Sequence, residues 1–227
     1  MTPERYRRIV TVLQRRQPDL TVILEGVHKP HNLSAIQRSC DAAGVLEAHA
    51  IAPERPYRVH KATASGSARW VEVHSHASTE AAIGLLRRTG HRIYAAHLSP
   101  TAVDFRAPDY TRPTAFLLGT EKYGVSERAL ALADTHVVIP MYGMVASLNV
   151  SVAAALLLYE AQRQRQAAGL YDRCRLAPDR YRSLVFRWGY PRLARRFDAL
   201  GLPYPDIGED GRITGEIPEE IRRQIGR

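Results

Sequence analysis

The sequence of 227 residues has only two cysteines and no long uncharged apolar run. Cys40 and Cys174 lie far apart and outside any zinc-ligand spacing, so we expect reduced thiols rather than a disulfide or a zinc site. No apolar run reaches the roughly 18 residues of a membrane-spanning helix, and the first residues lack the apolar region of a signal peptide. These absences predict a cytoplasmic protein that does not bind a membrane.

The sequence also lacks the glycine signatures of common nucleotide-binding folds. No two glycines are separated by a single residue, which excludes the Gly-x-Gly-x-x-Gly turn. Gly119 and Gly124 have P-loop spacing, but Val125 stands where the phosphate-binding lysine belongs. A cofactor bound mainly through the backbone groups of loops remains compatible with the sequence.

Metal-binding patterns are sparse. The nine histidines include the pairs His28/His31 and His74/His76, and we find no third ligand near either pair. We therefore expect structural or surface roles for these histidines and no bound metal.

Lysine is scarce as well, because 29 of the 32 basic residues are arginine. Residues 1–18 contain five arginines and one glutamate, and residues 163–196 contain ten arginines and two aspartates, whereas residues 19–162 carry no net charge. Basic flanks around a neutral core predict binding of a polyanion such as RNA, although a GC-rich genome would also favour arginine. The arginines that we expect to contact RNA are Arg7, Arg8, Arg15, Arg16, Arg163 and Arg165.

Apolar strand patterns alternate with helical patterns along the middle of the chain. This alternation predicts an α/β fold with a mainly parallel sheet and helices on both faces. Strands are predicted at 21–25, 47–51, 71–74, 92–97, 114–118 and 135–139. Helices are predicted at 4–16, 33–43, 59–65, 79–89, 126–133, 149–166, 179–187 and 191–199, with loops at 98–113 and 140–148. We expect three parts: a basic N-terminal helix (1–18), a core (19–166) and a basic helical extension (167–227).

Residues 139–160 are the most informative segment. A β-branched run ends at Pro140, a loop with glycine and methionine follows, and a helix of small and aliphatic residues begins after Ser147 and Asn149, two good N-cap residues. Such a turn exposes unpaired backbone groups at the positive end of a helix dipole. The small side chains of the helix would let a second backbone or subunit approach closely. A buried strand, loop and helix of any α/β enzyme would have a similar sequence pattern.

Three segments together resemble the motifs of the SPOUT class of RNA methyltransferases. Residues 29–44 resemble the first motif, residues 116–126 the second, with its Gly-x-Glu-x-x-Gly pattern, and residues 139–160 the third. The flanks at 15–22 and 201–205 are similar to those of the branch that methylates the ribose of guanosine 18 in tRNA. The resemblance covers about residues 1–205 and leaves the role of residues 206–227 open.

The resemblance carries expectations that composition and periodicity do not supply. It implies S-adenosylmethionine as cofactor, tRNA as substrate, a homodimer and a deep trefoil knot formed by the loops at 119–124 and 140–148. Knots are rare enough that chain physics alone would reject this one. By matching position, the residues that would surround the cofactor are Ala96, His97, Leu98, Gly119, Ile139, Met141 and Leu148. Packing at strand ends would explain each of them equally well.

Arg38 is the leading catalytic candidate. Leu33, Ile36, Cys40 and Ala43 form one apolar stripe of their helix, and Arg38 points away from it. Without the resemblance, Arg38 would read as a solvated surface residue. A guanidinium stays protonated, so we favour binding of the substrate phosphate and stabilisation of the developing ribose alkoxide. In the family this arginine is also discussed as the base, and the sequence does not decide between these roles.

Four other residues match the motifs. We expect Asn32 to cap its helix and also to position Arg38 and the substrate. Glu121 would orient Arg38 or the ammonium group of the cofactor, while Ser147 and Asn149 complete the third motif. His31 is a weaker candidate for a general base, because histidine beside a helix cap is common.

The resulting hypothesis is methylation of the 2′-oxygen of guanosine 18 in the tRNA D-loop. One alternative is a different ribose in tRNA or ribosomal RNA. A second alternative, from another functional class, is a non-catalytic RNA-binding protein. The presence of Asn32, Arg38, Glu121 and Asn149 argues against the second alternative, because a degenerate relative would have lost some of them.

Overall fold

The computed structural model describes residues 1–52, 69–120 and 123–225, and it divides the chain into two compact units. Residues 17–171 form the larger unit, and residues 1–16 together with 172–227 form the smaller one. The N-terminal and C-terminal segments that the sequence predicted as separate basic flanks therefore belong to one unit. The predicted helix at 59–65 and the candidate Glu121 lie outside the described residues.

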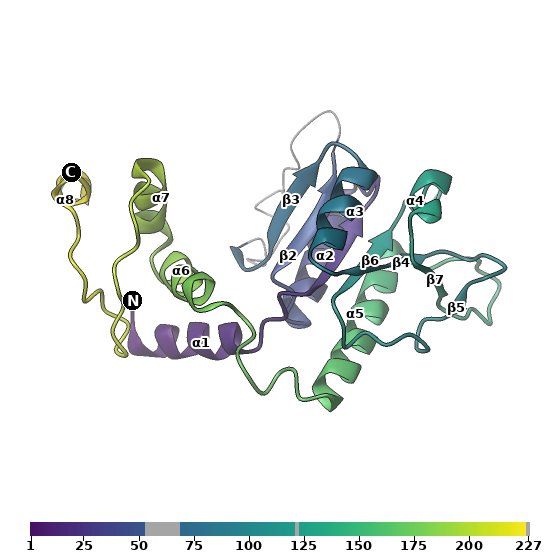
Figure 1. The fold of residues 1–227 in the computed structure, drawn as a ribbon, viewed down its shortest axis with the longest axis horizontal. Coiled ribbons are helices and arrows are strands. Elements are labelled where there is room, and N and C mark those ends of the chain that lie inside the picture. The colour runs from purple at the N-terminus through teal and green to yellow at the C-terminus, as the bar shows by residue number, and fades with distance from the viewer. Residues whose placement is uncertain (53–68, 121–122, 226–227) are drawn as a thin grey trace. The chain divides into compact units, whose positions relative to one another are not determined.

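The larger unit is built around a seven-stranded sheet in which all paired strands are parallel (Figure 1). The strands are β1 (Leu20–Leu24), β2 (Glu47–Ile51), β3 (Glu72–His76), β4 (Arg92–Ala96), β5 (Val103–Asp104), β6 (Thr114–Leu118) and β7 (Thr135–Val138). Their order across the sheet is β3-β2-β1-β6-β4-β7-β5. Every residue of β1 and β6 is buried, as expected for central strands covered on both faces.

Helices cover both faces of this sheet, which confirms the predicted fold class. Helices α2 (Pro30–Ala42) and α5 (Val150–Ala167) pack on one face against alternate residues of the central strands, including Val22 and Phe116. Helices α3 (Thr79–Arg88) and α4 (Glu127–Ala131) pack on the other face, against Ile23 and Leu117. The alternation of side chains along each strand thus supplies two separate apolar cores.

Two local differences from the predicted elements have simple physical reasons. Helix α2 begins at Pro30 rather than Leu33, because proline at the first helical position needs no amide partner. Asn32 therefore lies inside the first turn and does not cap the helix, so that part of the prediction is wrong. Strand β5 has two residues, too few for any periodicity, and lies in the segment predicted as a loop. Helix α8 (Glu219–Ile225) was likewise not predicted.

Arg165 of α5 is a structural residue and not an RNA contact, which corrects the prediction. Its side chain is fully buried, and Nη1 donates to Oδ1 of Asp19 at 2.6 Å and to Oε1 of Gln17 at 3.1 Å. Its other nitrogens donate to the carbonyl oxygens of Tyr110, Asp19 and Arg112. A buried guanidinium costs several kcal/mol unless its donors are all used, and here each N–H has an acceptor. Arg165 ties the end of α5 to the chain entering β1 and β6.

The smaller unit contains α1 (Pro3–Gln14), α6 (Pro178–Gly189), α7 (Pro191–Leu200) and α8. Phe186, Ala194, Phe197 and Ile221 form its buried apolar cluster. Arg16 is only 1% exposed, and its guanidinium lies 5.1 Å from the ring centroid of Trp188, so the expectation that it contacts RNA is also wrong.

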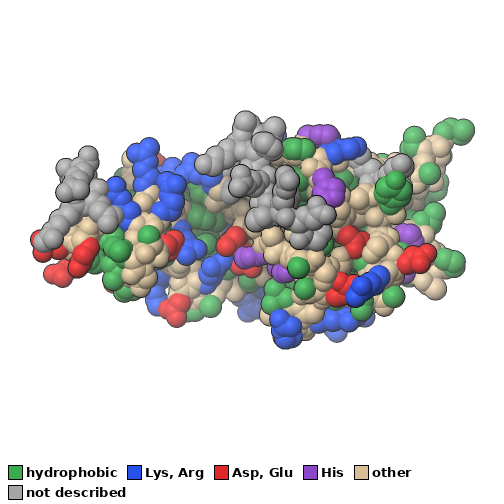
Figure 2. Space-filling model, turned by 90° about the horizontal axis from the view of Figure 1, so that it is seen from above, with side chains coloured by type: hydrophobic (Ala, Val, Ile, Leu, Met, Phe, Trp, Pro, Cys, Tyr) green, Lys and Arg blue, Asp and Glu red, His purple; other side chains and the backbone are tan. Residues whose placement is uncertain are grey.

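The other three arginines that were expected to contact RNA in the N-terminal segment, Arg7, Arg8 and Arg15, are exposed. Figure 2 shows Lys and Arg side chains gathered over α6 and α7. Among the described helices, none has the length and apolarity to cross a membrane.

A histidine cluster lies on β2 and β3, on the face that α3 covers. His49 is buried, its Nδ1 is 2.8 Å from Nε2 of His76, and its ring stacks on His74. Nε2 of His74 lies 3.3 Å from Oε2 of Glu47, and Glu72 is close to both. The expectation that the His74/His76 pair has no third ligand nearby is therefore wrong, because the adjacent parallel strands β2 and β3 bring Glu47 and Glu72 beside His74.

Burial of His49 makes the stability of the larger unit depend on pH. Desolvation, followed by the neighbouring His76 and His74, lowers the pKa of His49 to about 4. Folded His49 therefore binds fewer protons than unfolded His49 between pH 6.5 and 4, and stability is lost as the pH falls through this window. We expect the free energy of unfolding, from urea titrations followed by circular dichroism, to fall across it. His49→Gln should reduce the slope, and His31→Gln, at an exposed position, should not. Equal slopes in all three proteins would contradict this account.

Candidate functional site

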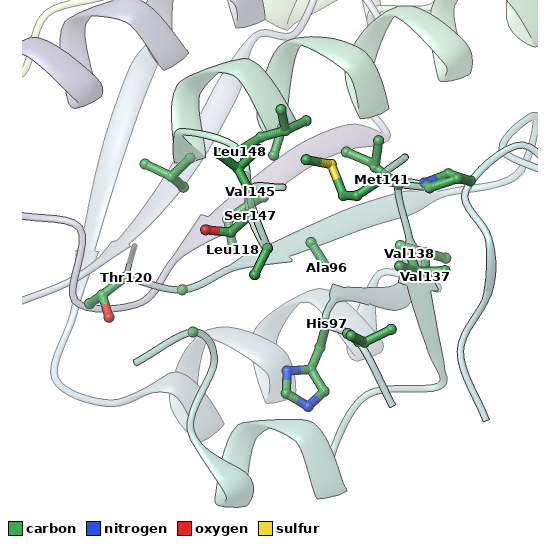
Figure 3. Close-up of a pocket in the computed structure, with 18 of the residues that line it drawn as sticks. Ala96, His97, Leu118, Thr120, Val137, Val138, Met141, Val145, Ser147 and Leu148 are labelled. Carbon is green, nitrogen blue, oxygen red and sulfur yellow. The ribbon is translucent and has the colours of Figure 1, made fainter. Parts of the chain in front are cut away.

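A cavity of about 790 Å³ opens where β4, β6 and β7 end. Because these neighbouring strands are parallel, their carboxyl ends and the loops that follow lie at one edge of the sheet, where ligands of open α/β sheets bind. Figure 3 shows Ala96 and His97 from the end of β4 on one side and Ser147 and Leu148 from the loop before α5 on the other. The lining also includes Leu118, Gly119, Thr120, Gly124, Val137, Val138, Ile139, Pro140, Met141, Gly143, Met144, Val145 and Ala146.

The loop after β6 forms one wall of the cavity. The amide of Thr120 donates to the carbonyl oxygen of Gly124 at 3.0 Å, and the amide of Gly124 donates back to Thr120 at 2.9 Å. A Cβ on Gly119 would lie 2.0 Å from the Gly124 backbone, and Gly124 has φ +67°. Both positions therefore require glycine, the first for the close approach and the second for its conformation.

The loop at 140–148 forms the opposite wall and leaves its backbone groups available. Among the described residues, the amides of 141–148 donate to no other backbone group. Asn149 caps α5 by accepting the amide of Ser151 at 2.8 Å, which confirms one of the two predicted caps. Unpaired amides beside a helix N-terminus suit a ligand with acceptor groups or negative charge.

Asn32 and Asn149 connect the first and third motifs. Nδ2 of Asn149 donates to Oδ1 of Asn32 at 3.1 Å, although the residues are 117 positions apart. Asn32 is 3% exposed. The hydrogen bond joins the first turn of α2 to the N-terminus of α5, next to the cavity residues Leu148 and Val150. Asn32 thus fixes the relation between two helices, which the sequence did not reveal.

Among the described residues that line the cavity, His97 is the one with an ionisable side chain, and it packs against a second histidine. Its ring meets His136 edge-on at a centroid distance of 5.8 Å. His136 lies 2.9 Å from the hydroxyl of Ser99 and 3.2 Å from the carbonyl oxygen of Leu130, so it bridges the chain after β4 to α4. Figure 3 shows the His97 ring at the lower side of the cavity.

The structure brings together all seven residues that were matched to a cofactor site, since each lines the cavity. Ser147 also lines it. Arg38 is exposed on α2, as its helical position predicts, and it does not belong to the lining of its own chain's cavity. Sequence reasoning did not select Leu118, Thr120, Val137, Val138 and Pro140, although all of them stand at the carboxyl ends of predicted strands.

Comparisons with known proteins agree with this geometry. Residues 19–159 match the SpoU rRNA Methylase family, and residues 163–216 match its C-terminal model. The chain belongs to the SpoU methylase family. The predicted resemblance to the SPOUT-class RNA methyltransferases is thereby confirmed.

Similar proteins cover between 66% and 95% of this SpoU methylase. The tRNA (guanosine(18)-2′-O)-methyltransferase of Escherichia coli K12 is 52% identical over 218 residues, which is 95% of each chain. The crystal structure of the Aquifex aeolicus TrmH/SpoU tRNA modifying enzyme has a TM-score of 0.78 at 39% identity and covers 83% of this chain and 96% of its own. An AdoMet-bound rRNA methyltransferase from Sinorhizobium meliloti has a TM-score of 0.58 at 31% identity, over 66% of this chain and 61% of its own.

The hydrogen bond between Asn32 and Asn149 should be measurable as a coupling energy. Asn149→Ala removes both the cap and this bond, and we expect it to cost about 1–2 kcal/mol of unfolding free energy. Asn149→Ser keeps a capping oxygen but is too short to reach Asn32, so it should lose only the bond. In a double-mutant cycle with Asn32→Ala, Asn149→Ser should therefore show a coupling of about 0.5 kcal/mol or more. Additive effects would show that the two helix ends are not joined through these side chains.

Proposed function

We propose that this protein transfers the methyl group of S-adenosylmethionine to the 2′-oxygen of guanosine 18 in the D-loop of tRNA. The observation that carries the proposal is the match to the E. coli guanosine-18 methyltransferase over 95% of both chains, combined with a cavity lined by the residues expected around the cofactor. Methylation of another ribose is the second candidate, because the family model and the S. meliloti neighbour are described as rRNA methylases.

The cavity fits S-adenosylmethionine in size and chemistry. Apolar side chains such as Leu118, Ile139 and Leu148 supply surfaces for the adenine ring. Free backbone amides of the loop at 141–148 supply donors for the ribose and carboxylate groups. When bound, the cofactor supplies an activated methyl group on its sulfonium, so the protein's task is to hold the ribose and manage its proton.

The ribose hydroxyl is a very weak acid, so the site has to help it lose its proton, and we assign this task to Arg38. A permanently charged, planar guanidinium can bind the neighbouring phosphate through two N–H groups and stabilise the developing alkoxide. Action of Arg38 as the base is the alternative reading. Asn32, Ser147 and Asn149 would position the substrate beside the cavity, and Glu121 would orient Arg38 or the cofactor's ammonium group.

We further propose a homodimer in which Arg38 of one subunit serves the cavity of the other. Arg38 does not line the cavity of its own chain. Val152, Leu156 and Tyr159 form an exposed apolar stripe on α5, at 46%, 39% and 52% exposure, and Tyr142 and Met144 are almost fully exposed nearby in the sequence. A stripe of this kind on a helix bordering the cavity suits a self-complementary interface.

The resemblance also underlies the proposal of a trefoil knot in the loops at 119–124 and 140–148, two loops that line the same cavity. We propose the cytoplasm as the site of action, in keeping with a tRNA substrate. For tRNA binding we retain the exposed Arg7, Arg8, Arg15 and Arg163, whose charge would act on phosphates and not on base identity. Arg163 also forms an ion pair with Glu160 at 2.7 Å, so it would have to bind a tRNA phosphate while keeping this pair or after breaking it.

Methyl transfer to defined RNA tests the function. Radiolabelled S-adenosylmethionine and an unmodified tRNA transcript should yield 2′-O-methylguanosine, identified after digestion to nucleosides. A matched transcript that already carries 2′-O-methylguanosine at position 18 should accept no label. Equal labelling of both transcripts, or labelling of ribosomal RNA fragments alone, would assign the activity to another ribose. Absence of label on every RNA would favour a non-catalytic RNA-binding protein.

Mixing two inactive variants tests whether the site is shared between subunits. Arg38→Ala should abolish turnover while leaving S-adenosylmethionine affinity within about threefold, because the side chain acts on the hydroxyl. Leu148→Arg should fill the cavity and prevent cofactor binding. When subunits of the two variants exchange, about half of the dimers are mixed and each has one complete site, so roughly a quarter of wild-type activity should return.

The control is the same mixture with Arg88→Ala, a change at an exposed arginine at the end of α3, in place of Arg38→Ala. That variant should be active by itself. If Arg38 acts within its own chain, every site in the first mixture lacks one component. Verified exchange of subunits without recovered activity would therefore rule out the shared site.

A further inference from the structure

Glu25 occupies a junction at the cavity edge of the sheet. It follows the last residue of β1, and its amide donates to the carbonyl oxygen of Leu118 at 2.9 Å, so it lies beside the end of β6. Gly119 and Thr120 follow β6 at this point, and Ser126, at the start of α4, contacts Glu25 again. Glu25 is half-buried and is separated from Ser126 by 101 positions in sequence.

The Glu25 carboxylate accepts three hydrogen bonds and makes no ion pair among the described residues. Oε2 accepts the amide of Ser126 at 2.8 Å, and Oε1 accepts the hydroxyls of Ser126 at 3.0 Å and Thr79 at 2.6 Å. Thr79 is the first residue of α3, and Ser126 is the N-cap of α4, where its hydroxyl also accepts the amide of Ala129. One carboxylate therefore connects β1 to the starts of two helices.

The same loop is restrained from a second side by Gly26. This glycine has φ +67°, and a Cβ there would lie 2.9 Å from Cγ2 of Thr120. The Glu25–Gly26 step thus contacts the loop at Thr120, near its start, and at Ser126, at its end. The same loop supplies Gly119, Thr120 and Gly124 to the cavity wall.

We propose that Glu25 is a positioning residue that holds residues 119–120 and 123–126, the described parts of this loop, in their binding-ready arrangement and so sets the affinity for S-adenosylmethionine. This inference rests on the proposed function. A loop that is already ordered in the free protein loses less conformational entropy when the ligand binds, which strengthens binding without adding a contact. Glu25 does not line the cavity itself, so its effect passes through Ser126 and the loop.

The geometry distinguishes this role from direct electrostatic action on the ligand. All three donors to Glu25 are neutral, and two of them are hydroxyls, which can accept as well as donate. Glutamine has the same shape and can keep every contact: its oxygen accepts the Ser126 amide, and its NH₂ group donates to the two hydroxyls. Positioning requires the hydrogen bonds and not the charge.

The test compares Glu25→Ala with Glu25→Gln by calorimetric titration with S-adenosylmethionine and by steady-state methyl transfer. Glu25→Ala should raise Kd and KM for S-adenosylmethionine about tenfold or more, with kcat at saturation within about threefold. Glu25→Gln should stay within about threefold of wild type in all three quantities. Equal losses in the two variants would show that the charge acts on the ligand, and an unchanged Kd in Glu25→Ala would show that the loop does not need this contact. Either result overturns the proposal.

Two matched controls separate positioning from general loss of stability. Asp134→Asn alters another carboxylate that accepts a backbone amide, that of Ile93 at 2.7 Å, and it should lower stability without changing Kd. Ser126→Ala and Ser78→Ala each remove a serine N-cap hydroxyl, from α4 and α3 respectively, but only Ser126 contacts Glu25. Ser126→Ala should weaken cofactor binding and Ser78→Ala should not. This pair decides the question even if Glu25→Ala fails to fold.

Amide hydrogen exchange on the ligand-free protein gives a readout that does not depend on cofactor binding. Exchange at Gly124 and Ser126 should accelerate in Glu25→Ala, or in Ser126→Ala where the former does not fold, and stay near wild type in Glu25→Gln. Wild-type protein that fails to bind S-adenosylmethionine would overturn the proposed function. Unchanged exchange at both amides would overturn the positioning role separately.

Discussion

Parallel pairing of β1, β6, β4 and β7 is the constraint on which the site depends. Parallel strands point their carboxyl ends to one edge, so the loops after β4, β6 and β7 have to meet there. Burial on both faces maintains this arrangement, because all residues of β1 and β6 are enclosed between the α2/α5 layer and the α3/α4 layer. The cavity is the space left between loops that the sheet brings together.

A few polar contacts then give those loops a defined shape. Asn149 bonds to Asn32, Glu25 bonds to Ser126 and Thr79, and the Gly119 and Gly124 backbones approach within a distance that only glycine permits. A single hydrogen bond contributes only about 1 kcal/mol net, so the apolar cores dominate stability. Each of these contacts can form in only one arrangement of its partners, so together they select a single conformation for the cavity walls.

The number of arginines in a segment does not show how many of them are available to bind RNA. Arg163 and Arg165 lie two positions apart in the basic segment and are equivalent in any count of charges. Arg163 faces solvent, whereas Arg165 is fully enclosed and uses its donors on Asp19, Gln17 and three carbonyl groups. Removing one partner of such a buried pair typically costs about 3–5 kcal/mol. The available positive charge of the flanks is therefore smaller than the composition indicates, and it resides in exposed residues such as Arg7, Arg8 and Arg15.

The sequence by itself determined the fold class, most of the helices and strands, and the family. Periodicity reports which residues of a segment share a buried face, and the three motifs lie on contiguous segments. The seven residues expected around the cofactor came from the resemblance by matching position, and all seven line the cavity. The Arg38 face of α2 followed from helical spacing alone.

Only the tertiary structure decided the strand order, strand β5, and the partners of Asn32, Glu25, Arg165 and the histidines of β2 and β3. These contacts join residues separated by 117 positions for Asn32 and Asn149, 101 for Glu25 and Ser126, and 146 for Asp19 and Arg165. Local periodicity carries no information on such pairs, because an asparagine, a carboxylate or an arginine satisfies its hydrogen bonds with whatever group the folded chain places beside it.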